Sequence, residues 1–321
     1  MKKTRVFCLM VVFCLLTCIV LASCAVTLKP DQGNDTENTL HTDNADNNDD
    51  TNTEESAETD TDTANNSADD NNSSGESIQE SVLYEANGIK ITAKKYDSDD
   101  LWGEGIKLLI ENDSDKDITV STNAVIVNDY MIDEWFSESV ASGKKSNATL
   151  YVDAEDLGTF GISDIGKVEI YFNIYDSDTW DDIDNPDCIT IKTNLFDSMD
   201  TTADFPGTVF YDKNGIKILG YYSEQSDYWG DIINIYCENN SGRKINMSTE
   251  DFSVNGFMID SYFIETVYDG KKVLSEISVS SSELEENDIT EIENISFKLK
   301  IYDSDEYELI DETDEIKLNI K

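Results

Sequence analysis

Histidine is almost absent from this sequence of 321 residues, in which His41 is the only example. It lies in a stretch made mainly of Asp, Asn and Thr residues. Ser-His, Cys-His and histidine-metal arrangements are therefore excluded from any folded part of the chain. Pairs of carboxylates can also do acid and base work, but they are unspecific evidence in a chain with 68 Asp and Glu residues. We expect a protein that is not an enzyme, with a carboxylate-based glycan hydrolase as a minor alternative.

Basic residues are also scarce. The chain has 23 Lys and Arg residues against 68 Asp and Glu residues, which gives a formal net charge of −45 at pH 7. Binding to a phosphate backbone depends largely on clustered Lys and Arg, so we expect no nucleic acid as a partner. The same acidity argues against adhesion to anionic lipid head groups.

Cysteine is scarce beyond the N-terminus. Of the six cysteines, four lie in the first 24 residues, and the other two are Cys188 and Cys237. Cys237 follows Ile233 and Ile235 in alternation, which indicates a small buried residue in a strand. Cys188 is interpreted as peripheral. A disulfide between these two stays open, because the pairing depends on a Cα separation that a sequence does not give.

The first 23 residues have the pattern of a targeting segment. Lys2, Lys3 and Arg5 precede an apolar run over residues 6–20, and Leu-Ala-Ser then leads into Cys24. This pattern resembles a bacterial lipoprotein signal. The resemblance implies cleavage before Cys24 and a lipid on its sulfur, which would hold the protein on the extracellular face of the cell membrane. The alternative is an uncleaved membrane helix, for which the apolar run is short.

Residues 24–81 are expected to form a disordered acidic spacer. They are mainly Asp, Asn, Thr, Ser and Glu, with almost no aromatic or branched apolar residues and with Lys29 as the only cation. Low hydrophobicity combined with repelling charge prevents a packed core. Such a segment extends as a flexible coil and would lift the following residues away from the membrane.

The rest of the chain repeats itself. An offset of 127 positions aligns Gly88 with Gly215 and Val127 with Val254 without a gap, and more than a third of the paired positions are identical over residues 82–193. A period of this size indicates tandem globular domains rather than a solenoid of short repeats. We therefore expect one domain over residues 82–193, a linker over 194–207 and a second domain over 208–321.

Apolar residues alternate with polar ones in several short runs of each repeat, which is typical of half-buried antiparallel strands. Asn-Gly pairs at residues 87–88 and 214–215 supply the positive φ angles of tight hairpins. We expect seven or eight strands per repeat and one helical turn in each, near residues 153–158 and 280–285. The predicted fold is all-β, with two tandem immunoglobulin-like antiparallel β-sandwiches. The expected inward residues are Ile89, Ile91, Ile106, Leu108, Ile110, Val168, Ile170, Phe172 and Ile174, with Ile216, Ile218, Ile233, Ile235, Cys237, Ile295, Phe297, Leu299 and Ile301 in the second repeat.

Three motifs in these repeats are shared with a known group of proteins. They are Asn-Gly-Ile-Lys-Ile at residues 87–91 and 214–218, Val-Asn-Gly-Phe-Met-Ile at 254–259, and the Gly-Lys-Lys turns at 143–145 and 270–272. They resemble the immunoglobulin-like domains of uncharacterised function that occur, often duplicated, in surface lipoproteins of low-GC Gram-positive bacteria. The resemblance implies a sandwich fold and surface display, and it assigns no catalytic residues. The first repeat departs from the motif at Asp129, which is expected to weaken the turn without moving the register.

Acidic residues recur in both repeats after the same strand. A loop with several hard oxygen ligands suits Ca²⁺, and extracellular domains bind this ion weakly. The alternative is a solvated turn, since Asp and Ser stabilise turns. The candidate ligands are Asp176, Asp178, Asp184 and Asp187, with Asp303, Asp305, Asp311 and Asp314 in the second repeat. No other cofactor is expected.

Aromatic residues recur at matching positions too. Trp180 and Tyr307 follow the acidic loop outside the strand pattern, so we expect these two rings to be exposed and to be candidates for ligand binding. Trp102 and Trp229 have the parity of inward residues and are predicted to be core. The Gly-Lys-Lys turns are interpreted as hairpin tips with solvated lysines, and contact with phosphate-rich wall polymers is the alternative.

These observations lead to an expected function. We expect a lipid-anchored surface protein whose two non-catalytic modules mediate binding or adhesion to a cell-wall polymer, a glycan or an extracellular protein. The alternatives are an inert structural spacer and a scaffold for exported partners in the cell envelope.

Overall fold

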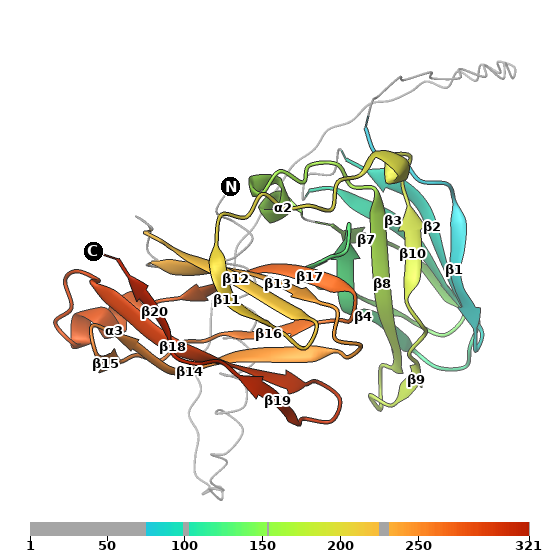
Figure 1. Cartoon of the computed structure of the whole chain (residues 1–321). Coiled ribbons are helices and arrows are strands. Elements are labelled where there is room, and N and C mark those ends of the chain that lie inside the picture. Colours follow the sequence, from blue (N-terminus) through green and yellow to red (C-terminus); the bar gives the residue numbers. More distant parts are fainter. Residues whose placement is uncertain (1–74, 99–102, 153, 225–230, 321) are drawn as a thin grey trace, which may run out of the picture. The chain divides into compact units, whose positions relative to one another are not determined.

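Strands dominate the computed structural model, which describes residues 75–98, 103–152, 154–224 and 231–320 (Figure 1). Within these ranges each repeat contains ten strands and one short α-helix. The prediction of seven or eight strands was therefore too low, because strands of two to four residues escape a period-two pattern. The two helical turns are confirmed. The signal segment, Cys24, His41, most of the expected spacer, Trp102 and Trp229 lie outside the described residues.

The first repeat has the following elements: β1 Ser81–Ala86, β2 Ile89–Asp97, β3 Gly105–Asn112, β4 Ile118–Val127, β5 Tyr130–Ile132, β6 Ser137–Val140, β7 Lys144–Tyr151, α2 Glu155–Thr159, β8 Lys167–Asp176, β9 Asp182–Asp184 and β10 Ile189–Lys192. A 3₁₀ turn, η2, covers Phe196–Ser198. The second repeat has β11 Thr208–Lys213, β12 Ile216–Ser223, β13 Ile232–Asn239, β14 Ile245–Val254, β15 Phe257–Met258, β16 Ile264–Val267, β17 Lys271–Ser278, α3 Ser281–Glu286, β18 Asn294–Asp303, β19 Leu309–Glu312 and β20 Ile316–Asn319.

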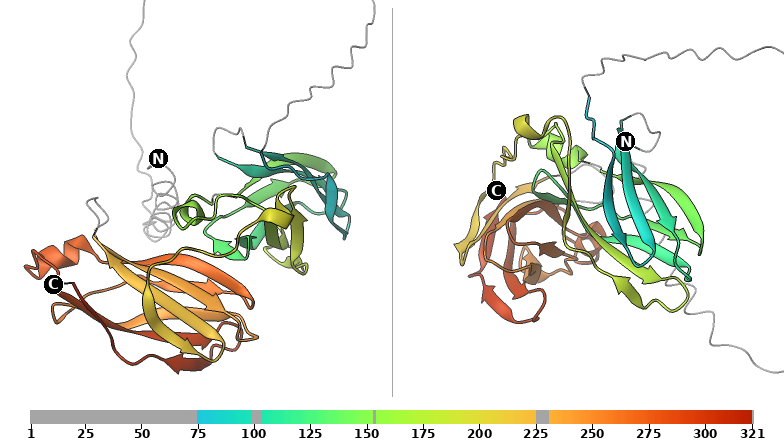
Figure 2. Two further views of the ribbon diagram at one scale, coloured as in Figure 1. Left: turned by 45° about the horizontal axis from the view of Figure 1, so that its top comes forward. Right: turned by 90° about the vertical axis from the view of Figure 1, so that its right-hand side faces the viewer.

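Each repeat is a sandwich of two antiparallel layers. In the first repeat one layer has the order β1-β2-β3-β7, and the other is built on β4 and β8 with β5, β6, β9 and β10 beside them. The pairings β3–β7 and β4–β8 join strands that are not sequential. They correspond to the B–E and C–F pairings of an immunoglobulin sandwich. The second repeat has the same order with β11-β12-β13-β17 opposite β14 and β18, and Figure 2 shows one of its layers in yellow to orange and the other in orange to red.

The core of each repeat lies between its two layers. All eighteen residues predicted to point inward are buried, with exposed fractions of 0 or 1%. The alternation works as a predictor because successive side chains of a strand point to opposite faces, and only one face meets the other layer. Cys237 belongs to this core, as predicted, and both Cys188 and Cys237 are free thiols.

The turns have the expected chemistry. Asn87 and Gly88 have φ angles of 54° and 77°, and Asn214 and Gly215 repeat these values at 55° and 77°. Both central residues of such a hairpin need positive φ, which Asn and Gly accept. Asp129 also has a positive φ, of 70°, where the second repeat has Gly256.

The predicted linker, residues 194–207, contains no strand, but it packs against its surroundings. Tyr130 donates its hydroxyl hydrogen to the carbonyl of Thr201 over 3.0 Å and accepts a hydrogen bond from the backbone N–H of Ala203. The ring of Phe205 lies 5.7 Å from that of Tyr236. The segment is therefore held by side chains of both repeats.

One layer of the first repeat continues into a layer of the second. Strand β5 pairs in parallel with β17, with Tyr130 opposite Lys272 and Met131 opposite Val273. The backbone N–H of Lys272 donates to the carbonyl of Asp129 over 2.9 Å. Parallel pairing between two sandwiches has no signature in either strand alone, and the sequence did not predict it.

Candidate functional site

The acidic loop of the first repeat is the hairpin between β8 and β9. One carboxylate oxygen of Asp176 accepts hydrogen bonds from the backbone N–H groups of Asp178, at 3.0 Å, and Thr179, at 3.2 Å. The N–H of Trp180 returns to the carbonyl of Asp176 over 2.8 Å. Trp180 has a φ of 65°, a conformation that non-glycine residues adopt at a cost. The buried carboxylate thus fixes a tight turn that ends in an aromatic residue.

The hairpin between β18 and β19 repeats this geometry. Asp303 accepts from the N–H groups of Asp305 and Glu306, both at 3.0 Å. The N–H of Tyr307 donates to the carbonyl of Asp303 over 2.9 Å, and Tyr307 has a φ of 56°. The same aspartate-capped turn therefore occurs in both repeats, although the surrounding side chains differ. This indicates that the turn itself requires Asp at its first position.

The second carboxylate oxygen of each capping aspartate is paired with a cation. Asp176 lies 2.9 Å from the Nζ of Lys116, and Asp303 lies 3.4 Å from a guanidinium nitrogen of Arg243. The hydrogen bond from Lys116 lowers the pKa of Asp176. The backbone hydrogen bonds, that of Glu306 first, and the charge of Arg243 lower the pKa of Asp303. Both groups are therefore carboxylates at neutral pH and already have partners.

The other six predicted calcium ligands lie in different surroundings. Asp184 and Asp311 accept hydrogen bonds from the hydroxyls of Tyr84 and Tyr211, at 2.7 and 2.8 Å. Burial first, and then the hydrogen bond to the carboxylate, raises the pKa of each of these tyrosines to about 12. The remaining four, Asp178, Asp187, Asp305 and Asp314, are exposed.

Over the described residues, no group of three or more acidic, cysteine or histidine side chains is arranged to hold a metal ion.

The two aromatic residues of the hairpins are exposed, as predicted. Trp180 is 73% exposed and Tyr307 is 80% exposed. The indole of Trp180 stacks on the ring of Tyr175, with centroids 5.5 Å apart and an angle of 16° between the planes. Each repeat therefore presents one aromatic face on a turn whose backbone is held by hydrogen bonds.

A second exposed aromatic pair was not predicted. Trp135 and Tyr262 occupy matching positions just before β6 and β16, and they are 75% and 89% exposed. Tyr262 borders a shallow groove with Ser248, Thr249, Ser261, Phe263 and Ile264. The sequence contains a signal for this pair, because an aromatic residue recurs at the same position of both repeats. The alternation of apolar and polar residues is too weak there to predict whether the ring points to the core or to solvent.

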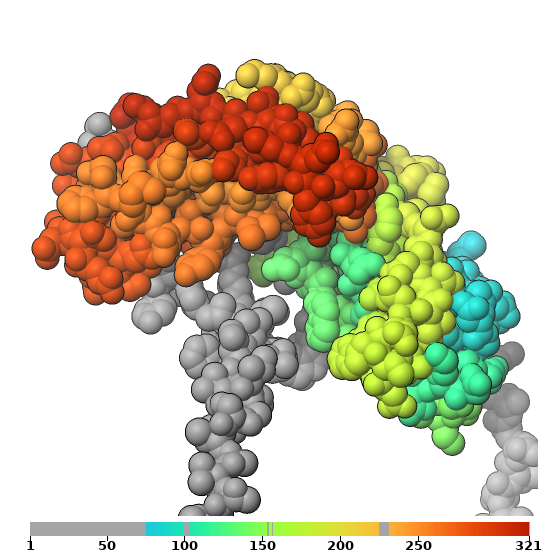
Figure 3. Space-filling model, turned by 90° about the horizontal axis from the view of Figure 1, so that it is seen from below, coloured from blue at the N-terminus to red at the C-terminus, as the bar shows by residue number. Residues whose placement is uncertain are grey.

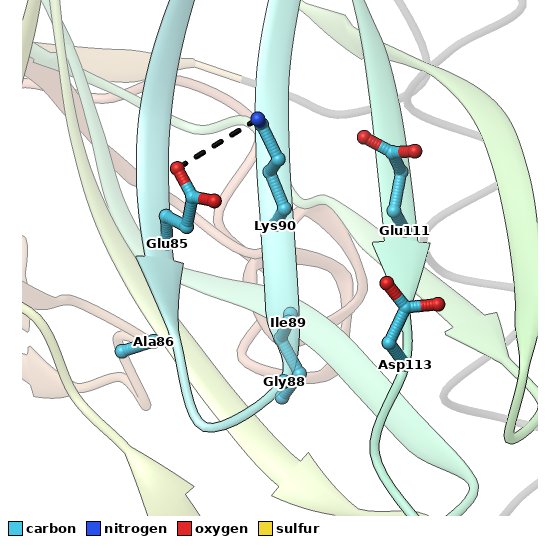
Figure 4. A pocket seen from close by; sticks show the side chains of 7 residues that line it. All are labelled: Glu85, Ala86, Gly88, Ile89, Lys90, Glu111 and Asp113. Carbon is cyan, nitrogen blue, oxygen red and sulfur yellow. Dashed lines mark ion pairs between the residues drawn. The ribbon is translucent and has the colours of Figure 1, made fainter.

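The described part of the chain offers shallow depressions rather than a deep cleft. The depression in Figure 4 is lined by Glu85, Ala86, Gly88, Ile89, Lys90, Glu111 and Asp113. Its lysine pairs with Glu85 over 3.7 Å, and nothing in it provides a nucleophile with an activating base. Figure 3 shows a face of the second repeat, coloured orange to red, on which the described residues leave only shallow hollows.

The interpretation of both Gly-Lys-Lys turns as solvated tips was wrong for the second repeat. The Nζ of Lys271 lies 3.0 Å from Asp129 and 2.6 Å from Glu169, and its side chain is only 13% exposed. Lys167 joins the same two carboxylates at 2.6 and 3.1 Å. In the first repeat the corresponding Lys144 is exposed. We name Asp129, Lys167, Glu169 and Lys271 the junction cluster, since it joins the repeats where β5 meets β17.

Within the described residues, no helix is long and apolar enough to cross a membrane. Neither a protein-family model nor a curated protein matches the chain.

Among solved structures, the chain is similar to part of the exo-β-D-glucosaminidase CsxA in an inhibitor complex, with a TM-score of 0.23, 10% identity, and coverage of 72% of this chain and 26% of that one. A substituted form of the Amycolatopsis orientalis exo-chitosanase CsxA, bound to PNP-β-D-glucosamine, gives a TM-score of 0.21 at 8% identity, covering 66% and 25% of the two chains. The chain thus spans about a quarter of the length of these structures. The likeness adds nothing to the β-sandwich that the sheets themselves show.

Proposed function

We propose that this protein is a lipid-anchored protein of the bacterial cell surface whose two β-sandwich repeats bind an extracellular ligand without transforming it. The observation that carries the proposal is the exposed aromatic ring on the same hairpin of each repeat, Trp180 and Tyr307. Large exposed rings on turns with an ordered backbone provide contact area at little entropic cost.

A glycan of the cell wall is the ligand class that suits these hairpins. The flat apolar face of a sugar ring stacks on an indole or phenol, and exposed carboxylates beside the ring accept hydrogen bonds from sugar hydroxyls. Asp178 and Asp181 provide such carboxylates next to Trp180. A chain with a net charge of −45 repels anionic polymers. We therefore propose a neutral or amino-bearing glycan rather than a phosphate-rich one.

The anchor in this proposal is a lipid on Cys24, which follows Leu-Ala-Ser at the end of the N-terminal apolar run. Replacement of Cys24 by Ala should release the protein from the membrane fraction. If the Cys24→Ala protein partitioned into detergent like the parent, the apolar segment itself would be the anchor.

A structural spacer is the second candidate, and the junction cluster favours it. Four charged side chains with exposed fractions of 11 to 27% tie the two repeats together, which suits a stiff stalk. A stalk needs no ligand, so a binding screen separates the two candidates.

The test is a glycan array, together with a pull-down from wall extract, using the full chain in detergent. Binding should be specific and should weaken at least tenfold, about 1.4 kcal/mol, when Trp180→Ala and Tyr307→Ala are combined. The matched control is Trp135→Ala with Tyr262→Ala, which removes two equally exposed rings outside the hairpins. Failure of all glycans and wall fractions to bind at high micromolar concentration would favour the spacer, and cleavage of a bound glycan would overturn the non-catalytic assignment.

A further inference from the structure

The edge strand β5 holds the second repeat, and the equivalent strand of the second repeat is open. Strand β15 pairs with β14 as β5 pairs with β4, with Val254 opposite Phe257 and Val127 opposite Tyr130. Among the described residues no strand covers the outer edge of β15. Tyr130 is fully buried, whereas Phe257 and Met258 are 48% and 65% exposed. The acceptor strand edge therefore exists twice, and it is occupied once.

The donor surface also exists twice. Strand β17 donates its edge to β5, and its equivalent in the first repeat is β7. Strand β7 is the last strand of the layer β1-β2-β3-β7, so one of its edges has no partner strand among the described residues. Its first residues, Lys144 and Lys145, are exposed and match Lys271 and Lys272. Exposed strand edges with unpaired N–H and C=O groups are templates for a further strand.

We propose that the open β15 edge binds β7 of a second copy of this chain, in the register by which β5 binds β17. The proposed occupant is a second copy of this chain, because every copy carries β7. This strand has the same lysine pair, Lys144 and Lys145, as the β17 strand that binds β5. Lys145 would lie opposite Phe257 and Ser146 opposite Met258. Donor and acceptor lie on different repeats, so the contact is head-to-tail and leaves one donor and one acceptor free at the ends.

The charges support this register. In the junction cluster Glu169 forms an ion pair with Lys271, and the second repeat has Ser296 in place of Glu169. Glu315 is the nearest substitute for that carboxylate, because it occupies the position of Cys188 in the first repeat, and the Sγ of Cys188 lies 3.9 Å from Glu169. Glu315 pairs with Lys317 over 2.9 Å and its side chain is about half exposed, so a lysine from β7 would meet it as a second cation, as Glu169 meets both Lys167 and Lys271.

The contact between copies should be weaker than the junction within the chain. The second repeat has Gly256 in place of Asp129, and the first has Ala141 and Asn147 in place of Tyr268 and Leu274. Asn294 stands in place of Lys167 as well, so one carboxylate, one lysine and two large side chains are missing from the surfaces that would meet. Tethering to one membrane would compensate by raising the effective concentration.

The test is disulfide trapping between two differently tagged full-length chains in detergent, one with Ser146→Cys and one with Met258→Cys. Neighbouring parallel strands bring these Cα atoms within disulfide range. We expect a mixed disulfide several times more abundant than in two controls: the unsubstituted chains, and Met258→Cys mixed with Ala148→Cys, which lies two residues along the same face of β7. Equal trapping at residues 146 and 148, or none above the unsubstituted chains, would overturn the proposal.

Swapping the charges of the proposed pair between Lys144 and Glu315 provides a second test of the register. Lys144→Glu on the Ser146→Cys chain should reduce trapping several-fold, because it places a carboxylate against Glu315. Glu315→Lys on the Met258→Cys chain should restore it. Both residues lie on the surface, and neither belongs to the aromatic hairpins. If trapping were insensitive to both substitutions, the proposed register would be wrong.

Discussion

At the scale of single residues, Asp129 shows how a departure from an internal repeat carries information. The sequence motif predicted only a weaker turn, since Gly256 occupies the position in the second repeat. The structure places the Asp129 carboxylate between Lys167 and Lys271, while its backbone keeps the positive φ of the turn. Asp129 thus adopts the backbone conformation of the turn and also forms two ion pairs at the junction.

Removing the shared cation of the junction cluster should destabilise the protein. Lys271→Met leaves Glu169 and Asp129 with Lys167 as their common partner, and we expect a loss of about 2 kcal/mol in the free energy of unfolding, between the values for surface and buried pairs. The matched control is Lys144→Met, the same change at the equivalent exposed position, with an expected effect of about 0.5 kcal/mol or less. Urea titration measures both, and equal losses would contradict the role of the cluster.

The pH dependence of this cluster has a defined sign. Burial by itself raises the pKa of Asp129, but the hydrogen bonds from Lys167 and Lys271 outweigh it and hold the pKa below its ordinary value of 3.8. A carboxyl with a lowered folded-state pKa stabilises the protein above its unfolded pKa and loses this contribution as the pH falls through the folded pKa.

The difference in unfolding free energy between the parent and Asp129→Asn should therefore be constant from about pH 5 to 7 and shrink below about pH 4. Urea titrations of both proteins across this range give the difference at each pH. A difference that grew on acidification would show that the carboxyl is stabilised in its neutral form.

At the scale of elements, the β8–β9 and β18–β19 hairpins explain why the acidic residues recur. Their first aspartate is buried and accepts hydrogen bonds from two backbone N–H groups, so the turn itself requires it. Asp178 and Asp305, two residues on, are exposed. One recurring pattern thus contains a buried aspartate that caps the turn, an aspartate that accepts a tyrosine hydroxyl, and exposed aspartates.

Asp176→Ala should destabilise the protein by about 2 kcal/mol, because it leaves two turn N–H groups and Lys116 without their acceptor. Asp178→Ala in the same loop should cost about 0.5 kcal/mol or less. Thermal or urea unfolding gives both values. Equal effects would mean that the cap does not decide the turn.

Calcium should have no measurable effect on the melting temperature of the parent protein, compared with EDTA at constant ionic strength. Both oxygens of Asp176 and of Asp303 already have hydrogen-bonding or ionic partners, and an ion would have to displace them. Calorimetry makes the comparison. A rise of several degrees in calcium, lost in Asp178→Asn, would restore the weak calcium site.

At the scale of the whole molecule, the sequence predicted the features that occur in both repeats, and it did not predict the features that occur in only one. The sandwich and its inward residues were predictable because alternation and turn chemistry occur twice, in register, in two copies. The junction was not predictable, since Asp129, Lys167 and Glu169 have no counterparts in the second repeat and the pairing of β5 with β17 is a tertiary contact. The exposure of Trp180 followed from its place outside the strands, whereas that of Trp135 needed the three-dimensional turn.

The central claim, that the two aromatic hairpins bind glycan, is tested most directly by calorimetric titration of soluble wall glycan fragments into the full chain. Trp180→Ala with Tyr307→Ala should reduce the affinity at least tenfold, about 1.4 kcal/mol, because the aromatic ring of each proposed binding face is lost. Trp135→Ala with Tyr262→Ala should leave the affinity unchanged. Equal affinity of the parent and the hairpin variant, or a larger loss in the control pair, would contradict the account.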